Sequence, residues 1–347
     1  MRRKLWRNAK YASSVLVTLV LIASSAASAA QPFNPSPHTI DIPAWFKSSF
    51  LDFREDIAEA AKDRKRMMVY FGQDGCPYCR ELMRVNFSQK DIVEKTRKHF
   101  DAVAVNIWGD REVTWLDRKR YSEKSFAALL KIQFTPTVLF FDEKGNVVLR
   151  LNGYYPPYKF AAALDYVTGR HETRSSFAEY LAQYAREPAS GRLHDQPFLM
   201  RPPYDFARTR KGGRPLAVLF EQKDCAACDE LHRTGFRDKR VSALIGKLDV
   251  VRLELFGHGP LVTPSGRRST EADWARDLNV SYTPSILFFD AQGIEVFRIE
   301  AYVRTFHLAS GFDYVVSGDY RNEPSFQRYV QARAEKIRQA GGRIELW

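Results

Sequence analysis

The sequence predicts an α/β protein built from two tandem domains of one kind, each with a central mixed sheet flanked by helices, after an export signal. Three observations predict this. A short apolar strand leads into a C-x-x-C pair that opens a helix, the same pattern returns 149 residues later, and in each copy a Thr-Pro pair precedes two apolar runs joined by a turn. A chain of 347 residues is long enough for two domains with complete cores.

The first copy of the motif runs from Met67 to Cys79. Its apolar residues before Gly72 form a short run bounded by charge and glycine, which is typical of a central strand, and the residues after Cys79 follow a helical period. Because unpaired N–H groups and the helix dipole favour an anion at a helix start, we expect the Cys76 thiolate to be stabilised. Cys79 lies one turn further on, close enough to form a disulfide with Cys76. This context favours a redox motif.

The second copy runs from Leu216 to Cys228 and indicates a duplicated domain. Between residues 134–150 and 282–298, 9 of 17 positions are identical, and both stretches begin with a Thr-Pro pair after an aromatic residue. Chance does not produce this agreement together with a repeated C-x-x-C motif, so we interpret the chain as a tandem repeat.

Periodicity and turn residues predict the remaining elements. Four apolar residues at helical spacing, Phe50, Phe53, Ile57 and Ala61, predict one buried face of a helix over 48–63. Other elements of the first copy are helices over 91–100, 122–131 and 157–167, strands over 101–107, 137–141 and 147–151, and a polar insertion over 109–121. The second copy follows the same order, with a capped helix start at Thr270.

These elements divide the chain into six segments. They are a signal peptide over 1–30, an extended proline-rich arm over 31–50, the first domain over 51–170, a helix and linker over 171–203, the second domain over 204–320 and a C-terminal helix over 321–347. The linker is placed by its prolines and by Ser190 and Gly191, which are typical of a chain segment without regular structure.

The first 30 residues have the organisation of an export signal. Five basic residues, among them Arg2 and Arg3, precede a short apolar run from Val15 to Ala23, and Ala27-Ser28-Ala29 fits the cleavage pattern. The alternative of an uncleaved membrane anchor is disfavoured because the apolar run is shorter than the roughly 20 residues that span a bilayer. A twin-arginine signal is a second alternative, with the same destination. We expect a periplasmic protein that meets the membrane only through this transient signal.

The charge balance predicts no nucleic-acid partner. Removal of residues 1–30 takes away five positive charges and no negative ones, so the formal net charge falls from +12 to +7. Attraction to acidic partners is one interpretation of this surplus. A mixed, solvated surface is the favoured one, because lysines and arginines alternate with acids and no nucleic-acid-binding motif is present.

Three stretches of the sequence resemble a known protein family. They are Gln73-Asp74-Gly75-Cys76-Pro77-Tyr78-Cys79, then Asn106-Ile107-Trp108-Gly109-Asp110-Arg111-Glu112, then Phe134-Thr135-Pro136-Thr137. With 60 residues from the first cysteine to the proline, the order of these motifs looks like the thioredoxin fold. The amino-acid sequence of the three stretches resembles the SoxW-like periplasmic thioredoxins associated with sulfur-oxidation operons. The resemblance covers residues 52–170. Residues 204–320 are thioredoxin-like only, because the insertion over 257–269 and the Cys-Ala-Ala-Cys motif differ.

The resemblance implies a substrate-binding role for the Thr-Pro pairs. In thioredoxin-like proteins this proline is cis and packs beside the disulfide, and the residue before it offers its backbone to an extended substrate. Carried over to this chain, the implied substrate-binding residues are Thr135 and Pro136 in the first domain and Thr283 and Pro284 in the second.

One departure concerns the buried acid of the family, which stands six residues before the first cysteine. Here Tyr70 occupies that position in the first domain and Leu219 in the second, so the usual proton acceptor of the buried thiol is missing. Glu221 is a candidate substitute in the second domain, but a solvated glutamate is the favoured interpretation.

All four cysteines fall in the two C-x-x-C pairs, which suits an oxidising compartment. A four-cysteine zinc site is disfavoured by the separation of the pairs, and haem attachment by Arg80 and Asp229, which stand where a histidine is needed. Purely structural disulfides remain an alternative, more so for Cys225–Cys228, because Asp224 and Asp229 are expected to raise the pKa of its thiols. No metal or organic cofactor is expected, since no nucleotide or flavin fingerprint is present.

Two classes of function therefore remain. The first is a thiol–disulfide oxidoreductase that works through mixed disulfides, with the catalytic cysteines Cys76, Cys79, Cys225 and Cys228, protein thiol or disulfide clients and a protein electron donor. The second is a binding or chaperone-like module with little turnover. The Cys-Pro-Tyr-Cys motif favours the first class. We expect the first domain to be the working centre, with a relay between the two pairs as the alternative.

The position of Cys76 at a helix start generates a prediction: Cys76 is the attacking thiol and Cys79 the resolving one. Alkylation of the reduced protein at different pH values should show Cys76 titrating below the free-thiol pKa of about 8.5. Faster alkylation of Cys79 than of Cys76 would contradict the assignment.

Overall fold

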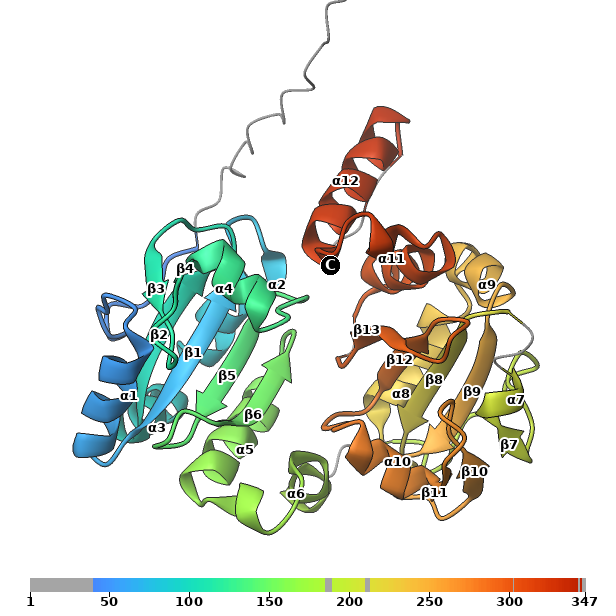
Figure 1. Cartoon of the computed structure of the whole chain (residues 1–347), viewed down its shortest axis with the longest axis horizontal. Helices are drawn as coiled ribbons and strands as arrows, with labels where there is room; N and C mark the ends of the chain where they lie inside the picture. The colour runs from blue at the N-terminus through green and yellow to red at the C-terminus, as the bar shows by residue number, and fades with distance from the viewer. Residues whose placement is uncertain (1–39, 185–188, 210–212, 302, 343, 345–347) are drawn as a thin grey trace, which may run out of the picture. The chain divides into compact units, whose positions relative to one another are not determined.

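The computed structural model describes residues 40–184, 189–209, 213–301, 303–342 and 344 (Figure 1). The expected signal peptide over 1–30 lies outside these residues, as do residues 31–39 of the expected arm. Among the helices of the described ranges, none combines the length and the apolar character needed to cross a bilayer.

Strand β1 (Arg66–Gly72) is the centre of the first domain and is buried along its whole length. It pairs in parallel with β2 (Phe100–Asn106) and antiparallel with β5 (Thr137–Phe141), which forms a hairpin with β6 (Val147–Asn152). The sheet order is therefore β2-β1-β5-β6. This mixed sheet confirms the predicted fold class for the first copy.

Side chains of β1 alternate between two cores, one on each face of the sheet. Met68 and Tyr70 pack in the core that contains both cysteines, whereas Met67, Val69 and Phe71 pack in the other. Helices cover both faces (Figure 1). The helices are α1 (Phe53–Lys62), α2 (Pro77–Glu81) with the π-helical turn Leu82–Asn86, α3 (Lys90–His99), α4 (Glu123–Leu129), α5 (Pro157–Thr168), the 3₁₀ turn His171–Thr173 and α6 (Phe177–Tyr184).

The second domain repeats this sheet in the order β13-β12-β8-β9, again with one parallel and two antiparallel pairings. Its strands are β8 (Leu216–Glu221), β9 (Asp249–Glu254), β12 (Ser285–Phe289) and β13 (Glu295–Ile299). Its helices are α7 (Phe206–Thr209), α8 (Ala226–Glu230) with the π-helical turn Leu231–Gly235, α9 (Lys239–Ile245), α10 (Glu271–Asp277), α11 (Thr305–Val316), the 3₁₀ turn Asp319–Arg321 and α12 (Phe326–Gln339). The duplicated domain is thus confirmed.

The predicted polar insertions contain short strands that the sequence did not indicate. In the first domain β3 (Glu112–Thr114) and β4 (Arg120–Ser122) form a hairpin, held by the fully buried Val113. In the second, β10 (Pro260–Val262) pairs with β11 (Arg268–Thr270) and with β7 (Tyr204–Asp205). One or two apolar residues in a polar stretch are too few to show a period.

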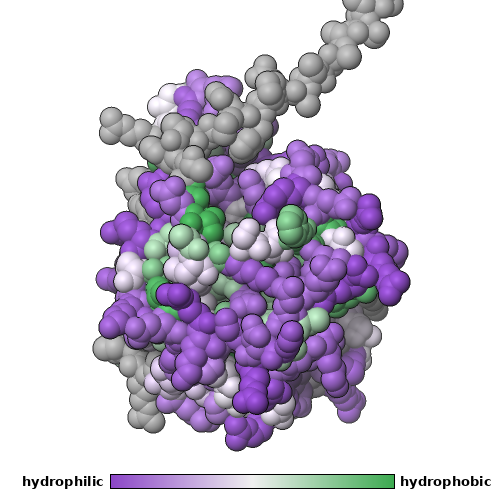
Figure 2. Space-filling model, turned by 90° about the vertical axis from the view of Figure 1, so that its left-hand side faces the viewer, coloured by the Kyte–Doolittle hydropathy of each residue, from purple (hydrophilic) through white to green (hydrophobic). Residues whose placement is uncertain are grey.

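The predicted start of the first helix is wrong. The helix begins at Phe53, because Asp52 accepts hydrogen bonds from the backbone N–H groups of Arg54 and Glu55 as an N-cap. Phe50 precedes the helix and is fully exposed, whereas Phe53 and Ile57 are buried as expected. The face of the molecule in Figure 2 is mostly hydrophilic, with hydrophobic residues in small groups only.

Glu123 at the start of α4 holds the loop that follows β2. Its buried carboxylate accepts hydrogen bonds from the backbone N–H groups of Asn106 (2.9 Å) and Arg111 (3.3 Å) and forms an ion pair with the Arg111 guanidinium at 2.7 Å. A Cβ atom on Gly109 would lie 1.9 Å from this carboxylate, so the loop needs glycine there. The same loop carries Trp108, which contacts the candidate site.

We therefore predict that Glu123→Ala destabilises the first domain by about 2 kcal/mol, because two backbone donors lose their acceptor. Chemical unfolding followed by tryptophan fluorescence measures the change. Glu112→Ala, on the exposed hairpin beside it, is the control and should stay within about 0.5 kcal/mol of the parent. Equal effects of the two substitutions would contradict the role of Glu123.

Candidate active site

The first site lies where the central strand β1 ends and α2 begins. Cys76 is the N-cap of α2, and its Sγ accepts the backbone N–H of Cys79 at 3.0 Å, while Pro77 occupies the first helical position. The two cysteines form the predicted disulfide, with Cα atoms 5.2 Å apart. Cys79 is fully buried and Cys76 is 4% exposed, so Cys76 is the more accessible sulfur. A helix start of this kind favours a thiolate, and Cys79 takes the more deeply buried position of the two.

The loop before β5 brings the Thr-Pro pair against this disulfide. The Thr135–Pro136 peptide bond is cis, as expected, and the Thr135 carbonyl oxygen lies 3.4 Å from Cys76 Sγ. The pair therefore borders the sulfur that a substrate has to reach. This places two predicted substrate-binding residues beside the two predicted catalytic ones.

Gln73, which was not among the predicted site residues, links the end of the strand to this loop. Its side-chain amide donates to Thr135 Oγ1 at 3.1 Å, and the Trp108 indole N–H donates to its amide oxygen. Because Gln73 has partners on both sides, its amide is held in one orientation. In the second domain Gln222 occupies the same place and donates to Thr283 Oγ1 at 2.7 Å. The signal in the sequence was a glutamine three residues before the first cysteine in both copies.

The second site has the same frame. Cys225 is the N-cap of α8, its Sγ accepts the backbone N–H of Cys228 at 3.0 Å, and the two cysteines form the second disulfide. The Thr283–Pro284 bond is cis, as in the first domain. A further cis bond, Pro202–Pro203, was not expected from the sequence. Both predicted sites are therefore assembled, each within its own domain.

The two sites differ in what lies beneath the disulfide. In the first domain Tyr70 fills this space: it is buried, burial raises its pKa above the ordinary value, and its hydroxyl has no partner among the described residues. A Cβ atom on Gly72 would lie 1.9 Å from that hydroxyl. In the second domain Glu221 stands at the position of Gly72. The interpretation of Glu221 as a solvated residue is wrong, because it is 0% exposed.

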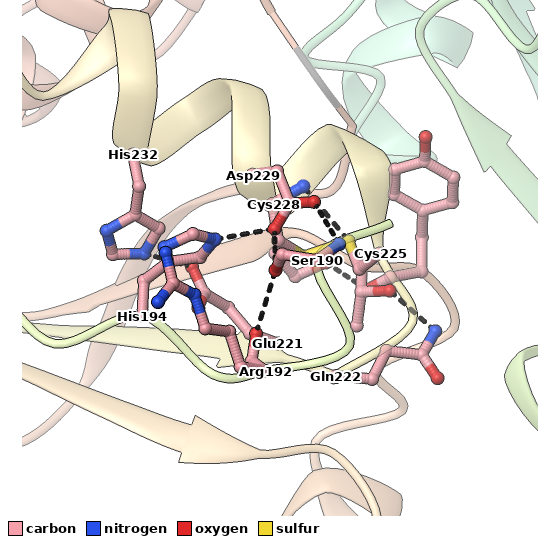
Figure 3. Close-up of a disulfide and its surroundings, with 12 residues drawn as sticks. Ser190, Arg192, His194, Glu221, Gln222, Cys225, Cys228, Asp229 and His232 are labelled. Atoms are coloured by element: carbon pink, nitrogen blue, oxygen red, sulfur yellow. Dashed lines mark hydrogen bonds and ion pairs between the residues drawn. A yellow bond between two sulfur atoms is a disulfide. The ribbon is translucent and has the colours of Figure 1, made fainter. Parts of the chain in front are cut away.

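One of the two acids near the second cysteine pair has more hydrogen-bond partners than expected. Asp224 is exposed, but Asp229 accepts hydrogen bonds from the backbone and hydroxyl of Ser190 and lies 2.5 Å from His194 Nε2 (Figure 3). Partial burial acts to raise the pKa of Asp229, but these bonds hold it below its usual value. Asp229 is therefore a carboxylate with several hydrogen-bond partners and not a free surface charge.

No metal site emerges from the described parts of the chain, where three or more His, Cys, Asp or Glu side chains never converge in a way that could hold an ion. The chemistry that the two sites can perform is carried by their sulfur atoms: a disulfide next to a cis proline can be opened by an incoming thiolate, and a dithiol can reduce a disulfide.

The match to a protein family agrees with this fold. A family model described as a thioredoxin-like domain matches twice, over residues 53–168 and 202–315. A search of curated proteins found no match. Among solved structures, a thioredoxin-fold protein from Helicobacter pylori is 26% identical, with a TM-score of 0.31, and the match covers 39% of this chain and 90% of that chain. A protein disulfide oxidoreductase from Aeropyrum pernix is 16% identical, with a TM-score of 0.25, over 80% of this chain and 97% of that chain.

The contact between Gln73 and Thr135 generates a prediction. Gln73→Leu should lower kcat/KM for a protein disulfide about 5-fold, mainly through KM, because the loop that borders Cys76 loses a hydrogen bond worth about 1 kcal/mol. The pH dependence of Cys76 alkylation should not move. Gln89→Leu is the matched control, since Gln89 is the N-cap of α3 and makes no side-chain cap hydrogen bond. A shift of the alkylation profile in Gln73→Leu would contradict a positioning role.

Proposed function

The chain belongs to the thioredoxin-like domain family, and from this premise we propose that it is a periplasmic thiol–disulfide oxidoreductase whose first domain is the working centre. The enzyme class follows from the family together with two C-x-x-C disulfides, each at a helix start in a thioredoxin-like domain. The observation that carries the proposal is the contact of Cys76 Sγ with the Thr135 carbonyl beside a cis proline.

In the reduced first domain, the Cys76 thiolate attacks one sulfur of a client disulfide and expels the other as a thiolate. Cys79 then loses its proton and attacks Cys76 Sγ, which releases the second client thiolate and closes the Cys76–Cys79 disulfide. Two electrons pass from the cysteine pair to the client, and the two expelled thiolates take protons from solvent. Proteins of this family act on protein thiols, so the electrons that restore the dithiol come, in this proposal, from a second protein.

The Thr135 backbone is the proposed docking element for the client. Its carbonyl already borders Cys76, and the edge of an extended peptide laid along this loop would bring its own disulfide to Cys76 Sγ. The Thr283–Pro284 pair offers the second domain the same arrangement.

Three sequence features support the location and the class of client. Residues 1–30 have the organisation of an export signal, all four cysteines are paired as suits an oxidising compartment, and the stretches around Cys76, Trp108 and Pro136 resemble SoxW-like periplasmic thioredoxins. On this basis the proposed client is a protein of sulfur oxidation. Fractionation of cells that make the full chain, together with capture of a mixed disulfide by Cys79→Ser, tests both statements.

The first domain is proposed as the working centre because its cysteine pair carries proline and a following arginine, whereas acids flank the second pair. We predict that Cys76→Ser/Cys79→Ser loses nearly all activity in reduction of a generic protein disulfide, and that Cys225→Ser/Cys228→Ser keeps most of it.

Equal loss in both double variants would instead support a relay between the pairs. Loss in the second variant alone would overturn the assignment. A parent protein that binds a client with no turnover would favour the binding or chaperone-like module.

A further inference from the structure

Residues 189–201, which we call the strap, run from the helix after the second disulfide to the edge of the second sheet. They lie outside both stretches that match the thioredoxin-like family model, 53–168 and 202–315. At the sheet edge the backbone N–H of Met200 donates to the carbonyl oxygen of Val250 at 2.8 Å, and Leu199 forms a β-bridge with the same residue. The strap therefore belongs to the second domain, although it precedes the family match.

The arm of the first domain makes the same contact with its own sheet. There the backbone N–H of Lys47 donates to the carbonyl oxygen of Ala102 at 2.8 Å. Ala102 pairs with Met68 and Val250 with Ala217, and each of these partners stands eight residues before the first cysteine of its pair. The arm and the strap are thus equivalent elements, and the arm is an internal reference for the strap.

The two elements differ in how they are anchored to the helix after the disulfide. Trp45 and Phe46 of the arm pack their rings on Phe87, with centroids 5.2 and 5.6 Å apart. The strap has one such contact, between Phe198 and Phe236 at 5.4 Å. Its other anchors are polar, and two of them involve histidines, so the strap contains groups that titrate where the arm has rings that do not.

The first polar anchor is Asp229, the residue after Cys228. Its carboxylate accepts hydrogen bonds from the backbone N–H and the hydroxyl of Ser190, each at 2.7 Å, and lies 2.5 Å from His194 Nε2 (Figure 3). Partial burial acts to raise the pKa of Asp229, but these bonds hold it below its usual value, so Asp229 stays ionised at neutral pH. The contact with His194 is an ion pair only while that ring carries its second proton.

The second polar anchor is His232, which is 2% exposed. Its Nδ1 lies 3.2 Å from the side-chain amide of Gln196, and this amide can bond either protonation state because it has a donor and an acceptor end. Its Nε2 lies 2.8 Å from Oε1 of Glu221, which is 0% exposed and whose Oε2 has no hydrogen-bond partner among the described residues. Without the second proton of His232, the charge of Glu221 is uncompensated in a dry interior, which favours entry of water.

These four side chains, which we call the polar pocket, hold the strap best when both histidines are protonated. The histidine–carboxylate contacts are 2.5 and 2.8 Å, whereas the centroids of the two stacked rings are 4.6 Å apart. Because Coulomb energy falls with distance, attraction to the carboxylates exceeds repulsion between the rings. Histidine changes its charge between about pH 5 and 8, so the anchors weaken as the pH rises through this range. The polar pocket comprises Glu221, His232, His194 and Asp229.

We propose that the strap is a pH-sensitive element that holds the helix of the second cysteine pair. It is closed while His194 and His232 carry their second protons, and it loosens when rising pH removes them. Because Asp229 follows Cys228 directly, the state of the strap acts on the chain next to the second disulfide. A strap of this kind needs no catalytic turnover, so it is independent of the proposed function.

The other charged groups beside the anchors keep their charge state between pH 5 and 8. Arg252 of β9 donates to the carbonyl oxygen of His194. Burial lowers the pKa of His307 of α11 to about 4, so this histidine stays neutral. The remaining groups are the exposed Arg192 and the ion pairs Asp195–Arg201, Lys223–Glu254, Glu230–Arg233 and Asp313–Arg333.

The test is hydrogen–deuterium exchange of the full oxidised chain, measured by mass at pH 6 and pH 8. Peptides that contain the N–H groups of Ser190 and Met200 report on the strap. After correction for the intrinsic effect of pH on exchange, their protection should fall about 5-fold, the scale of the difference between a charged and a neutral hydrogen bond. Peptides of the arm, residues 40–50, should show no such fall.

Asp229→Asn removes the charge and keeps a hydrogen-bonding side chain, so it should show low protection of the strap at both pH values and lose most of the pH response. Asp195→Asn is the matched control, because it makes the same change in an exposed ion pair of the strap and should respond like the parent. His194→Gln changes a partly exposed residue and provides the same test where Asp229→Asn fails to fold.

Equal protection of the strap at both pH values in the parent would overturn the proposal. An undiminished pH response in Asp229→Asn and His194→Gln would do the same, as would an equal loss of protection in the arm, because the whole chain would then loosen. Disulfide reduction by the parent is measured separately: its absence contradicts the proposed function and leaves the strap standing.

Discussion

The sulfur at a helix N-cap is the interaction on which the rest of each domain depends. Cys76 and Cys225 each accept the backbone N–H of the cysteine one turn on, and this requires the helix to start at the end of the central strand. The strand is buried on both faces, so its end is fixed by the whole core. The cis-proline loop completes the site, because it comes from the neighbouring strand of the same sheet. Fold and site are thus positioned by one strand.

The two copies share the backbone geometry of the site and differ in the side chains beneath the disulfide. Both domains retain the glutamine that holds the Thr-Pro loop, which shows that the loop must stay in place whatever lies beneath the disulfide. Beneath it, an aromatic set in one domain corresponds to a carboxylate and two histidines in the other. The two sites therefore share one backbone geometry and differ in the side chains that lie beneath the disulfide.

Local patterns in the sequence were enough to predict the fold class, the strand before each cysteine pair and the helix after it. Spacing also placed the two Thr-Pro pairs, since the proline stands 60 and 59 residues after the first cysteine of each pair. The interpretation of Glu221 as a solvated residue was wrong because its burial depends on contacts that are distant in the sequence. Glu221 is buried against His232, which the linker residue Gln196 contacts in turn. Neither contact can be predicted from the neighbours of Glu221 in the chain. The prediction that Phe50 lies on the buried face of the first helix was wrong for a local reason, because Asp52 caps the helix and the helix therefore begins after Phe50.

The polar pocket also explains why the segment before the second domain is more than a spacer. Ser190, His194 and Gln196 come from this segment, and each bonds a side chain of the pocket. The segment then adds a bridge from Leu199 to Val250 at the edge of the second sheet. If it moved away, His232 would lose its Gln196 partner in a dry interior. A buried polar pair that has lost a partner is more unfavourable than no polar pair there at all. The buried acid and the segment therefore depend on each other, and a change to residues 190–196 acts on the second disulfide without touching a cysteine.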